Sequence, residues 1–141
     1  MPVISATAEE RAALIGQKTL ETARELTQKT DMRFIGVGTI ADPAPLELDG
    51  FISVTDQERL IGKGAVGEVI GWVFDAHGRL IEDTVNERVS SAPVLPGPTE
   101  PTIACAYGRD KIPAIRAAVE GRLVNGLITD EETAIALTES S

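Results

Sequence analysis

The spacing of apolar residues changes most clearly in the C-terminal third of the chain. Residues 102–107 form an apolar run, residues 112–119 carry apolar side chains at helical spacing, and residues 127–128 form a second short run after Gly121. Two apolar runs that flank an amphipathic helix predict a βαβ unit. The strands of such a unit are parallel, and its crossover is right-handed.

The N-terminal part of the chain predicts a single long helix. Thr7 and Glu10 have the spacing of a capping box, and the pattern favours a helix over residues 8–28. Its apolar stripe is narrow, so we expect the helix to pack on one face only. Gly16 weakens the helix by up to ~1 kcal/mol relative to alanine.

Residues 33–38 predict the first buried strand, and they run into a glycine pattern. Residues 36–41 match G-x-G-x-x-A, which is typical of dinucleotide-binding folds. A helix must begin inside that motif, but the two prolines in residues 42–45 prevent one. We therefore interpret the match as a glycine-rich turn after a strand.

The next segments predict an acidic loop and a short helix. Residues 47–50 are predicted to form the loop. Residues 54–61 favour a helix, with Ser53 or Thr55 as its N-cap residue.

A β-hairpin is predicted next. Residues 65–74 are almost entirely apolar, residues 75–78 carry a turn signal, and residues 79–85 are predicted to return as the partner strand. The four prolines of residues 90–101 indicate a stiff surface connection to the βαβ unit.

A final helix is predicted over residues 130–138, with Thr129 and Glu132 as a second capping box. Helices and strands then alternate along the chain, and the βαβ unit supplies parallel pairing. The sequence therefore predicts an α/β domain with a mainly parallel sheet and a β-hairpin.

Composition narrows the classes of partner. The chain has 141 residues, 43% of them hydrophobic, with a formal net charge of −9. That charge disfavours nucleic acid and anionic membrane surfaces as direct partners, because both require clustered cations. The single cysteine, Cys105, excludes an intrachain disulfide, and no long apolar segment or leader pattern is present. We therefore expect a cytoplasmic protein.

Catalytic and metal-binding motifs are absent from the sequence. His77 is the only histidine, and it lies in a predicted turn. One histidine and one cysteine are too few for a metal site of nitrogen and sulfur ligands. We expect no metal and no cofactor.

Two charged residues stand out from this background. Glu68 interrupts an apolar run, where a buried carboxylate requires partners. Lys111 lies at the start of the crossover helix, beyond the carboxyl end of a predicted parallel strand, where ligands bind in open sheets. The residues alone support two interpretations equally. Either both groups serve a ligand site, or Glu68 faces solvent and the Lys111 stem lies along the surface.

Several segments together resemble the effector-binding domain of SorC-type bacterial transcriptional regulators. The resemblance rests on residues 31–38, 64–78, 86–88, 106–118 and 127–131, which occur in the order of the family pattern. It implies a Rossmann-like fold similar to that of phosphosugar isomerases and CoA-transferases. It also implies a phosphosugar, sugar or polyol effector, self-association into a homo-oligomer, and DNA binding by a separate helix-turn-helix domain.

The resemblance assigns roles to individual residues. It implies that Glu68 accepts hydrogen bonds from sugar hydroxyls and that Lys111 pairs with a sugar or phosphate oxygen. The predicted effector site also includes Gly38, Tyr107 and Gly108. Tyr107 replaces a glycine of the family pattern, and its ring would narrow the pocket or stack on a ligand.

The resemblance also implies a domain boundary. Residues 1–141 are expected to be the C-terminal portion of the sensing domain. The helix-turn-helix domain is absent from the chain, as is the first half of the sensing domain with its phosphate-binding loop. We expect self-association to cover the surface that this half would contact.

Three functional hypotheses follow from the sequence. The leading one is a binding module that senses a carbohydrate for a transcription factor, without catalysis. A second is a phosphosugar isomerase-like enzyme, with Glu68 as its only candidate general base. A third is a structural oligomerisation module.

Overall fold

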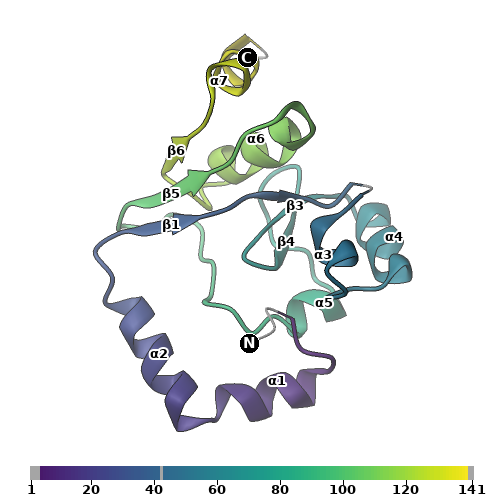
Figure 1. The fold of residues 1–141 in the computed structure, drawn as a ribbon, viewed down its shortest axis with the longest axis vertical. Helices are drawn as coiled ribbons and strands as arrows, with labels where there is room; N and C mark the ends of the chain where they lie inside the picture. The colour runs from purple at the N-terminus through teal and green to yellow at the C-terminus, as the bar shows by residue number, and fades with distance from the viewer. Residues whose placement is uncertain (1–3, 42, 140–141) are drawn as a thin grey trace.

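Two three-stranded sheets form the centre of the protein. The computed structural model describes residues 4–41 and 43–139 (Figure 1). One sheet is parallel, in the order β1 (Arg33–Ile35), β5 (Thr102–Cys105), β6 (Gly126–Ile128). The other is antiparallel, in the order β2 (Gly38–Thr39), β3 (Ala65–Val69), β4 (Trp72–Asp75). The chain is thus an α/β protein, as predicted from the sequence.

The predicted βαβ unit is confirmed. After β5 the chain makes the short 3₁₀ turn η1 (Arg109–Lys111), continues as α6 (Ile112–Glu120) and returns as β6, parallel to β5. The predicted final helix is α7 (Glu131–Glu139). The predicted capping box is wrong, because the Asp130 carboxylate accepts the bond from the Thr133 N–H, whereas the buried Thr129 hydroxyl has no partner among the described residues.

The first predicted strand proves to be two. Residues 33–35 pair in parallel with β5, whereas Gly38 and Thr39 pair antiparallel with β3. One straight strand cannot join both sheets, so the chain leaves one sheet and enters the other between Ile35 and Gly38. The prediction that this segment is buried is confirmed for Val37 and Gly38 and wrong for β1, which is an edge strand with Phe34 60% exposed. Asp42, part of the segment that argued against a dinucleotide site, lies outside the described residues.

The hairpin exists, but its turn lies earlier than predicted. The chain reverses at Ile70 and Gly71, whose φ angles of 44° and 92° are both positive, as in the primed turns that suit twisted hairpins. Residues 79–85 do not return as a strand, apart from an isolated bridge between Phe74 and Leu80. The predicted turn residues 75–78 do form a turn, which follows the second strand of the hairpin.

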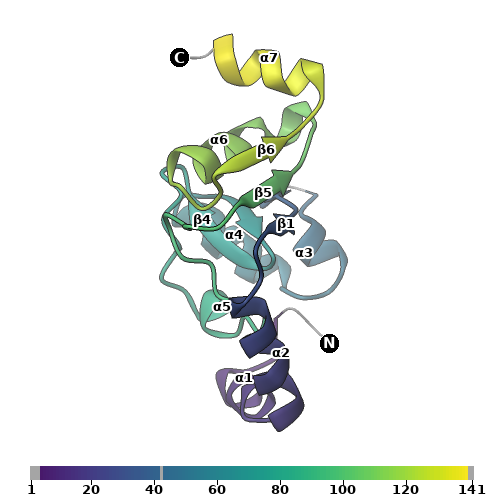
Figure 2. The same ribbon diagram turned by 90° about the vertical axis from the view of Figure 1, so that its left-hand side faces the viewer.

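The predicted N-terminal helix is divided in two. α1 (Ala8–Ile15) ends at Gly16, and α2 (Lys18–Gln28) begins after Gln17. The Thr7 hydroxyl caps α1 as predicted, but the Glu10 carboxylate accepts its bond from the Ala6 N–H instead of the cap residue. Neither helix buries a residue, and together they form an arm at the opposite end of the molecule from α7 (Figures 1 and 2).

Three further helices, α3, α4 and α5, lie between β2 and β5. The predicted helix after Ser53 is confirmed as α4 (Val54–Gly62), with a full capping box between Ser53 and Asp56. α5 (Thr84–Glu87) follows the hairpin. The predicted acidic loop is partly wrong, because Pro45–Leu48 form the short helix α3, which begins with proline at its first position.

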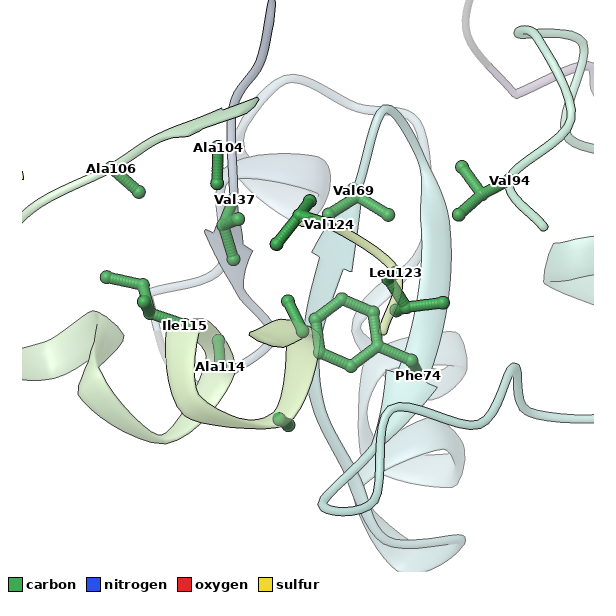
Figure 3. Packing of buried hydrophobic residues seen from close by; sticks show 12 residues of the cluster. Val37, Val69, Phe74, Val94, Ala104, Ala106, Ala114, Ile115, Leu123 and Val124 are labelled. Carbon is green, nitrogen blue, oxygen red and sulfur yellow. The ribbon is translucent and has the colours of Figure 1, made fainter. Parts of the chain in front are cut away.

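The hydrophobic core consists of two clusters, and the antiparallel sheet contributes to both. Val73 and Phe74 are adjacent on β4 and contribute to different clusters. The Phe74 cluster includes residues of α6 and the parallel sheet (Figure 3). The Val73 cluster includes Leu60 of α4 and Val85 of α5. Trp72 packs against both clusters, so the hairpin links the two halves of the core.

Two glycine contacts bring α6 close to the hairpin and to the turn that follows it. A Cβ atom on Gly67 of β3 would lie 2.5 Å from the Ala114 Cβ atom of α6. At the other end of the helix, a Cβ on Gly121 would lie 2.5 Å from the Cα of Gly78. Glycine at both positions therefore permits a backbone approach that any larger residue would prevent.

We predict that Gly67→Ala destabilises the protein by about 1–3 kcal/mol, because the added methyl group overpacks the contact with α6. Urea unfolding measures the change. Gly62→Ala is the matched control, since a Cβ there meets nothing within 4 Å. Equal stability of the two variants would contradict the close docking of α6.

Candidate functional site

A cavity of about 370 Å³ opens where the two sheets meet. Its walls come from the connection between β1 and β2, from α3 and the residues after it, from the hairpin, and from the end of η1. The lining residues are Gly36, Val37, Gly38, Pro45, Leu46, Asp49, Phe51, Glu68, Ile70, Gly71 and Lys111. We refer to this cavity as the junction pocket.

Glu68 projects from β3 into the junction pocket. Its Oε2 atom accepts a hydrogen bond of 2.7 Å from the Gly71 N–H in the hairpin turn. Oε1 has no hydrogen-bond partner among residues 4–41 and 43–139. Gly38, opposite Glu68 on β2, leaves room for this carboxylate, because a Cβ at position 38 would collide with Oε1. Gly38 thus allows the orientation that leaves one carboxylate oxygen free for a ligand.

Burial raises the pKa of Glu68 above its ordinary value, because desolvation disfavours the charged carboxylate. The hydrogen bond from Gly71 and the positive charge of Lys111 act in the opposite direction, but they do not outweigh burial. The partly buried Glu68 is therefore a carboxylate whose charge is costly without a ligand.

Lys111 reaches the same pocket from the other side. It is the last residue of η1, and η1 packs against β2. Its side chain makes no hydrogen bond or ion pair with any residue that the structure describes. Its charge nevertheless acts on Glu68, although no oxygen of Glu68 lies within the 4.0 Å of an ion pair. A cation and an anion that share a pocket without direct contact leave space for a small polar molecule between them.

Two predicted site residues, Tyr107 and Gly108, lie apart from this pair. The Tyr107 side chain is 69% exposed and does not line the junction pocket. The Gly108 N–H donates to the Thr133 hydroxyl of α7, and Arg109 pairs with Glu132. Of the polar segment that follows β5, only Lys111 therefore lines the pocket.

Asp49 and Phe51 are pocket residues that the sequence did not reveal. Both follow α3; Asp49 lies in the segment predicted as an acidic loop, and Phe51 comes directly after that segment. Pro45 at the first helical position was the available signal for this helix. Nothing in the local sequence, however, indicated that this helix and Glu68 of β3 line the same pocket.

Larger cavities occur elsewhere in the described part of the chain. A cavity of about 510 Å³ between α6 and α7 is lined by Arg116 and Asn125. Arg116 donates to the Ala136 carbonyl, and the Asn125 amide bonds to the Pro98 and Glu100 carbonyls. These side chains are already engaged within the protein, so we prefer the smaller junction pocket as the candidate site.

Metal binding and membrane insertion find no support in residues 4–41 and 43–139. No group of three or more histidine, cysteine, aspartate or glutamate side chains in that part of the chain is arranged to hold a metal ion. No helix there has both the length and the apolar character needed to cross a membrane.

Residues 1–139 match the protein family described as "Putative sugar-binding domain". The erythritol catabolism regulatory protein EryD of Brucella abortus is 34% identical over 137 residues, which are 97% of this chain and 43% of that protein. The transcriptional regulator LsrR of an Escherichia coli strain is 30% identical over 143 residues, covering 99% of this chain and 45% of that protein. The chain thus spans less than half the length of these curated relatives.

Solved structures share the fold. The sorbitol operon regulator SorC of Klebsiella pneumoniae superimposes with a TM-score of 0.86 at 22% identity, covering 97% of this chain and 45% of that one. A DeoR family transcriptional regulator of Listeria monocytogenes gives a TM-score of 0.89 at 24% identity, covering 97% of this chain and 56% of that one. These similarities confirm the predicted Rossmann-like architecture.

We predict that Glu68→Gln increases stability at neutral pH, because the variant removes the cost of a buried charge while its amide oxygen can still accept from Gly71. A carboxyl group with a raised folded-state pKa contributes stability below its unfolded pKa, near 4.3, and loses it as pH rises through the folded-state value. The stability gain of Glu68→Gln should therefore grow as pH rises from 4 towards neutrality.

Urea unfolding of both proteins across this pH range measures the difference. Glu58→Gln, at an exposed position on α4, is the control and should show no such pH dependence. If the free energies of unfolding of Glu68→Gln and the unmodified chain differ by the same amount at every pH, this result contradicts the raised pKa of Glu68.

Proposed function

Since this chain belongs to the sugar-binding domain family, whose matched relatives are bacterial transcriptional regulators, we propose that it is the ligand-sensing portion of a carbohydrate-responsive regulator. The observation that carries the proposal is the junction pocket, where the free Oε1 atom of Glu68 and the unpaired ammonium of Lys111 face one cavity.

The two groups suit a polyhydroxylated molecule. A carboxylate only accepts hydrogen bonds, and an ammonium only donates them. A sugar or polyol hydroxyl does both, so neighbouring hydroxyls can satisfy Glu68 and Lys111 together. A volume of about 370 Å³ is suitable for a small ligand of this kind.

DNA binding is assigned in this proposal to a separate helix-turn-helix domain. The net charge of −9 gives this chain no electrostatic advantage on DNA. The relatives are more than twice as long as the part that it matches, which leaves room in them for such a domain. Effector binding here would then change how the regulator holds DNA in the cytoplasm.

The proposal assigns no catalytic step to this chain. An isomerase of similar fold needs a general base together with a second acid or base beside the reacting carbons. Glu68 has the raised pKa of a candidate base, but the relatives named here are regulators. Turnover of a phosphosugar that is lost in Glu68→Gln would favour the enzyme instead.

We predict that Glu68→Ala and Lys111→Ala each weaken effector binding at least tenfold, since a hydrogen bond to a charged group contributes about 1.5–3 kcal/mol. Titration calorimetry of the chain with four- to six-carbon sugars, polyols and their phosphates measures the affinity. Ligand-induced increases in melting temperature provide a second measure.

Glu58→Ala and Lys29→Ala are matched controls, because both side chains are exposed and lie outside the pocket. They should bind as the unmodified chain does. If the pocket variants bind as tightly as these controls, the site assignment is wrong.

The same proposal includes a homo-oligomer that forms through the edge of the parallel sheet. β1 is an edge strand, and large apolar side chains are exposed beside it: Met32 is 49% exposed, Phe34 60% and Leu95 73%. These residues line one cavity, with Pro93 and Val94 behind them. A continuous apolar surface next to an unpaired strand is typical of an association site.

We predict that Phe34→Ser shifts the protein towards the monomer, because it removes an exposed aromatic group from this surface. Light scattering after size-exclusion chromatography measures the molar mass over a range of concentrations. Leu48→Ser, at a position 67% exposed on α3, is the control. If the unmodified chain is itself a monomer at every concentration, the proposed oligomer is wrong.

A further inference from the structure

Phe51 is the only aromatic side chain among the described residues that line the junction pocket. The charged groups of Glu68 and Lys111 come from the hairpin and from η1, whereas Phe51 comes from the segment after α3. Much of the remaining lining is apolar and consists of Val37, Pro45, Leu46 and Ile70. The pocket therefore has a polar part, which the proposed function uses, and an apolar part.

The end of α3 fixes the position of Phe51. Gly50 has a φ of 76°, a left-handed conformation that glycine adopts without strain. The Gly50 N–H donates to the Glu47 carbonyl over 2.9 Å, and the Phe51 N–H donates to the Leu46 carbonyl over 2.9 Å. These two bonds form a Schellman motif, in which the residue after the glycine often packs on the helix residue five positions before it. Leu46 holds that position here, and Phe51 packs against the core cluster that contains it.

The Phe51 ring is not used up by this packing. Leu46 is 7% exposed, whereas Phe51 keeps an intermediate exposure and lines the junction pocket. Aromatic surface that stays in contact with water is a source of binding free energy, since a ligand that covers it releases that water. Carbohydrates carry C–H groups between their hydroxyls, and a C–H group suits the negative face of an aromatic ring.

We propose that Phe51 is a ligand-binding residue, whose ring packs against the C–H groups of the effector while Glu68 and Lys111 hold its hydroxyls. The inference rests on the proposed function, because it concerns the same pocket. The ligand then lies with its hydroxyls towards the hairpin and η1 and with its carbon skeleton towards the segment after α3. This placement depends on C–H groups alone, so it applies equally to a sugar, a polyol and their phosphates.

NMR spectroscopy of the 141-residue chain tests the contact directly. The probes are erythritol, ribose, glucose and sorbitol with their terminal monophosphates, and the tightest binder among them is used. We expect nuclear Overhauser effects between phenylalanine ring protons and C–H protons of the bound probe, and we expect Phe51→Leu to abolish them. A residue that only supported the fold would give no such effect.

Phe34→Leu is the matched control for this experiment. Phe34 is also exposed and aromatic, but it lines a different cavity, beside β1. The variant should therefore retain both the Overhauser effects and the affinity. The third phenylalanine, Phe74, is fully buried in the core, where it is out of reach of a ligand.

Titration calorimetry with the same probe provides an independent measure. Phe51→Ala should weaken binding about fivefold, because the ring no longer removes C–H surface from water. Its heat capacity change on binding should also be less negative than that of the unmodified chain. Phe51→Leu keeps an apolar side chain against Leu46, so it should lose only about twofold in affinity and keep the melting temperature of the unmodified chain.

Three results would overturn the inference. Overhauser effects that are absent from the unmodified chain, or that persist in Phe51→Leu, would show that the ring does not touch the ligand. A Phe51→Ala variant that binds as tightly as Phe34→Leu would show that the contact contributes nothing. If Glu68→Ala and Lys111→Ala still weaken binding in these cases, the proposed function stands without the inference. If none of the probes binds, the proposed function fails, and the inference fails with it.

Discussion

The close packing of α6 against the hairpin is the contact on which the rest of the structure depends. Gly67 faces Ala114 and Gly78 faces Gly121, so the helix contacts the hairpin near one end and the turn after the hairpin near the other. Glu68 directly follows Gly67, and Lys111 directly precedes α6. The contact that completes the core therefore also sets the position of the two charged groups relative to each other. Polar residues held by rigid elements are positioned more accurately than residues on free loops.

Local sequence patterns were sufficient to predict those elements that depend on residues close together in the sequence. The βαβ unit, the helix after Ser53 and the presence of a hairpin all follow from apolar spacing and capping residues. The errors arose where tertiary pairing decides the outcome. Nothing in residues 33–39 shows that the segment joins two sheets, and Ile70 carries no turn signal although it adopts a positive φ. Such a conformation is unfavourable for a β-branched residue, and here the strand pairing on both sides stabilises it.

The site was predictable only in part, for a similar reason. Glu68 and Lys111 were identifiable because each conflicts with its local surroundings, as a charge in an apolar run and a cation at a helix start. Tyr107 and Gly108 satisfied a rule about strand ends, but the chain turns them away from the junction pocket. Asp49 was not identifiable, since an acidic residue directly after a short helix looks ordinary until the fold brings it to the pocket that Glu68 also lines.

The space left by Gly38 links two distant positions of the sequence. The Glu68 carboxylate occupies the volume that a side chain at position 38 would need, so the two residues cannot be exchanged independently. A relative with alanine or a larger residue at the first position must carry a shorter side chain at the second, or turn its carboxylate elsewhere. The residue at position 38, read from sequence alone, thus indicates whether a family member can place a glutamate carboxylate in this cavity.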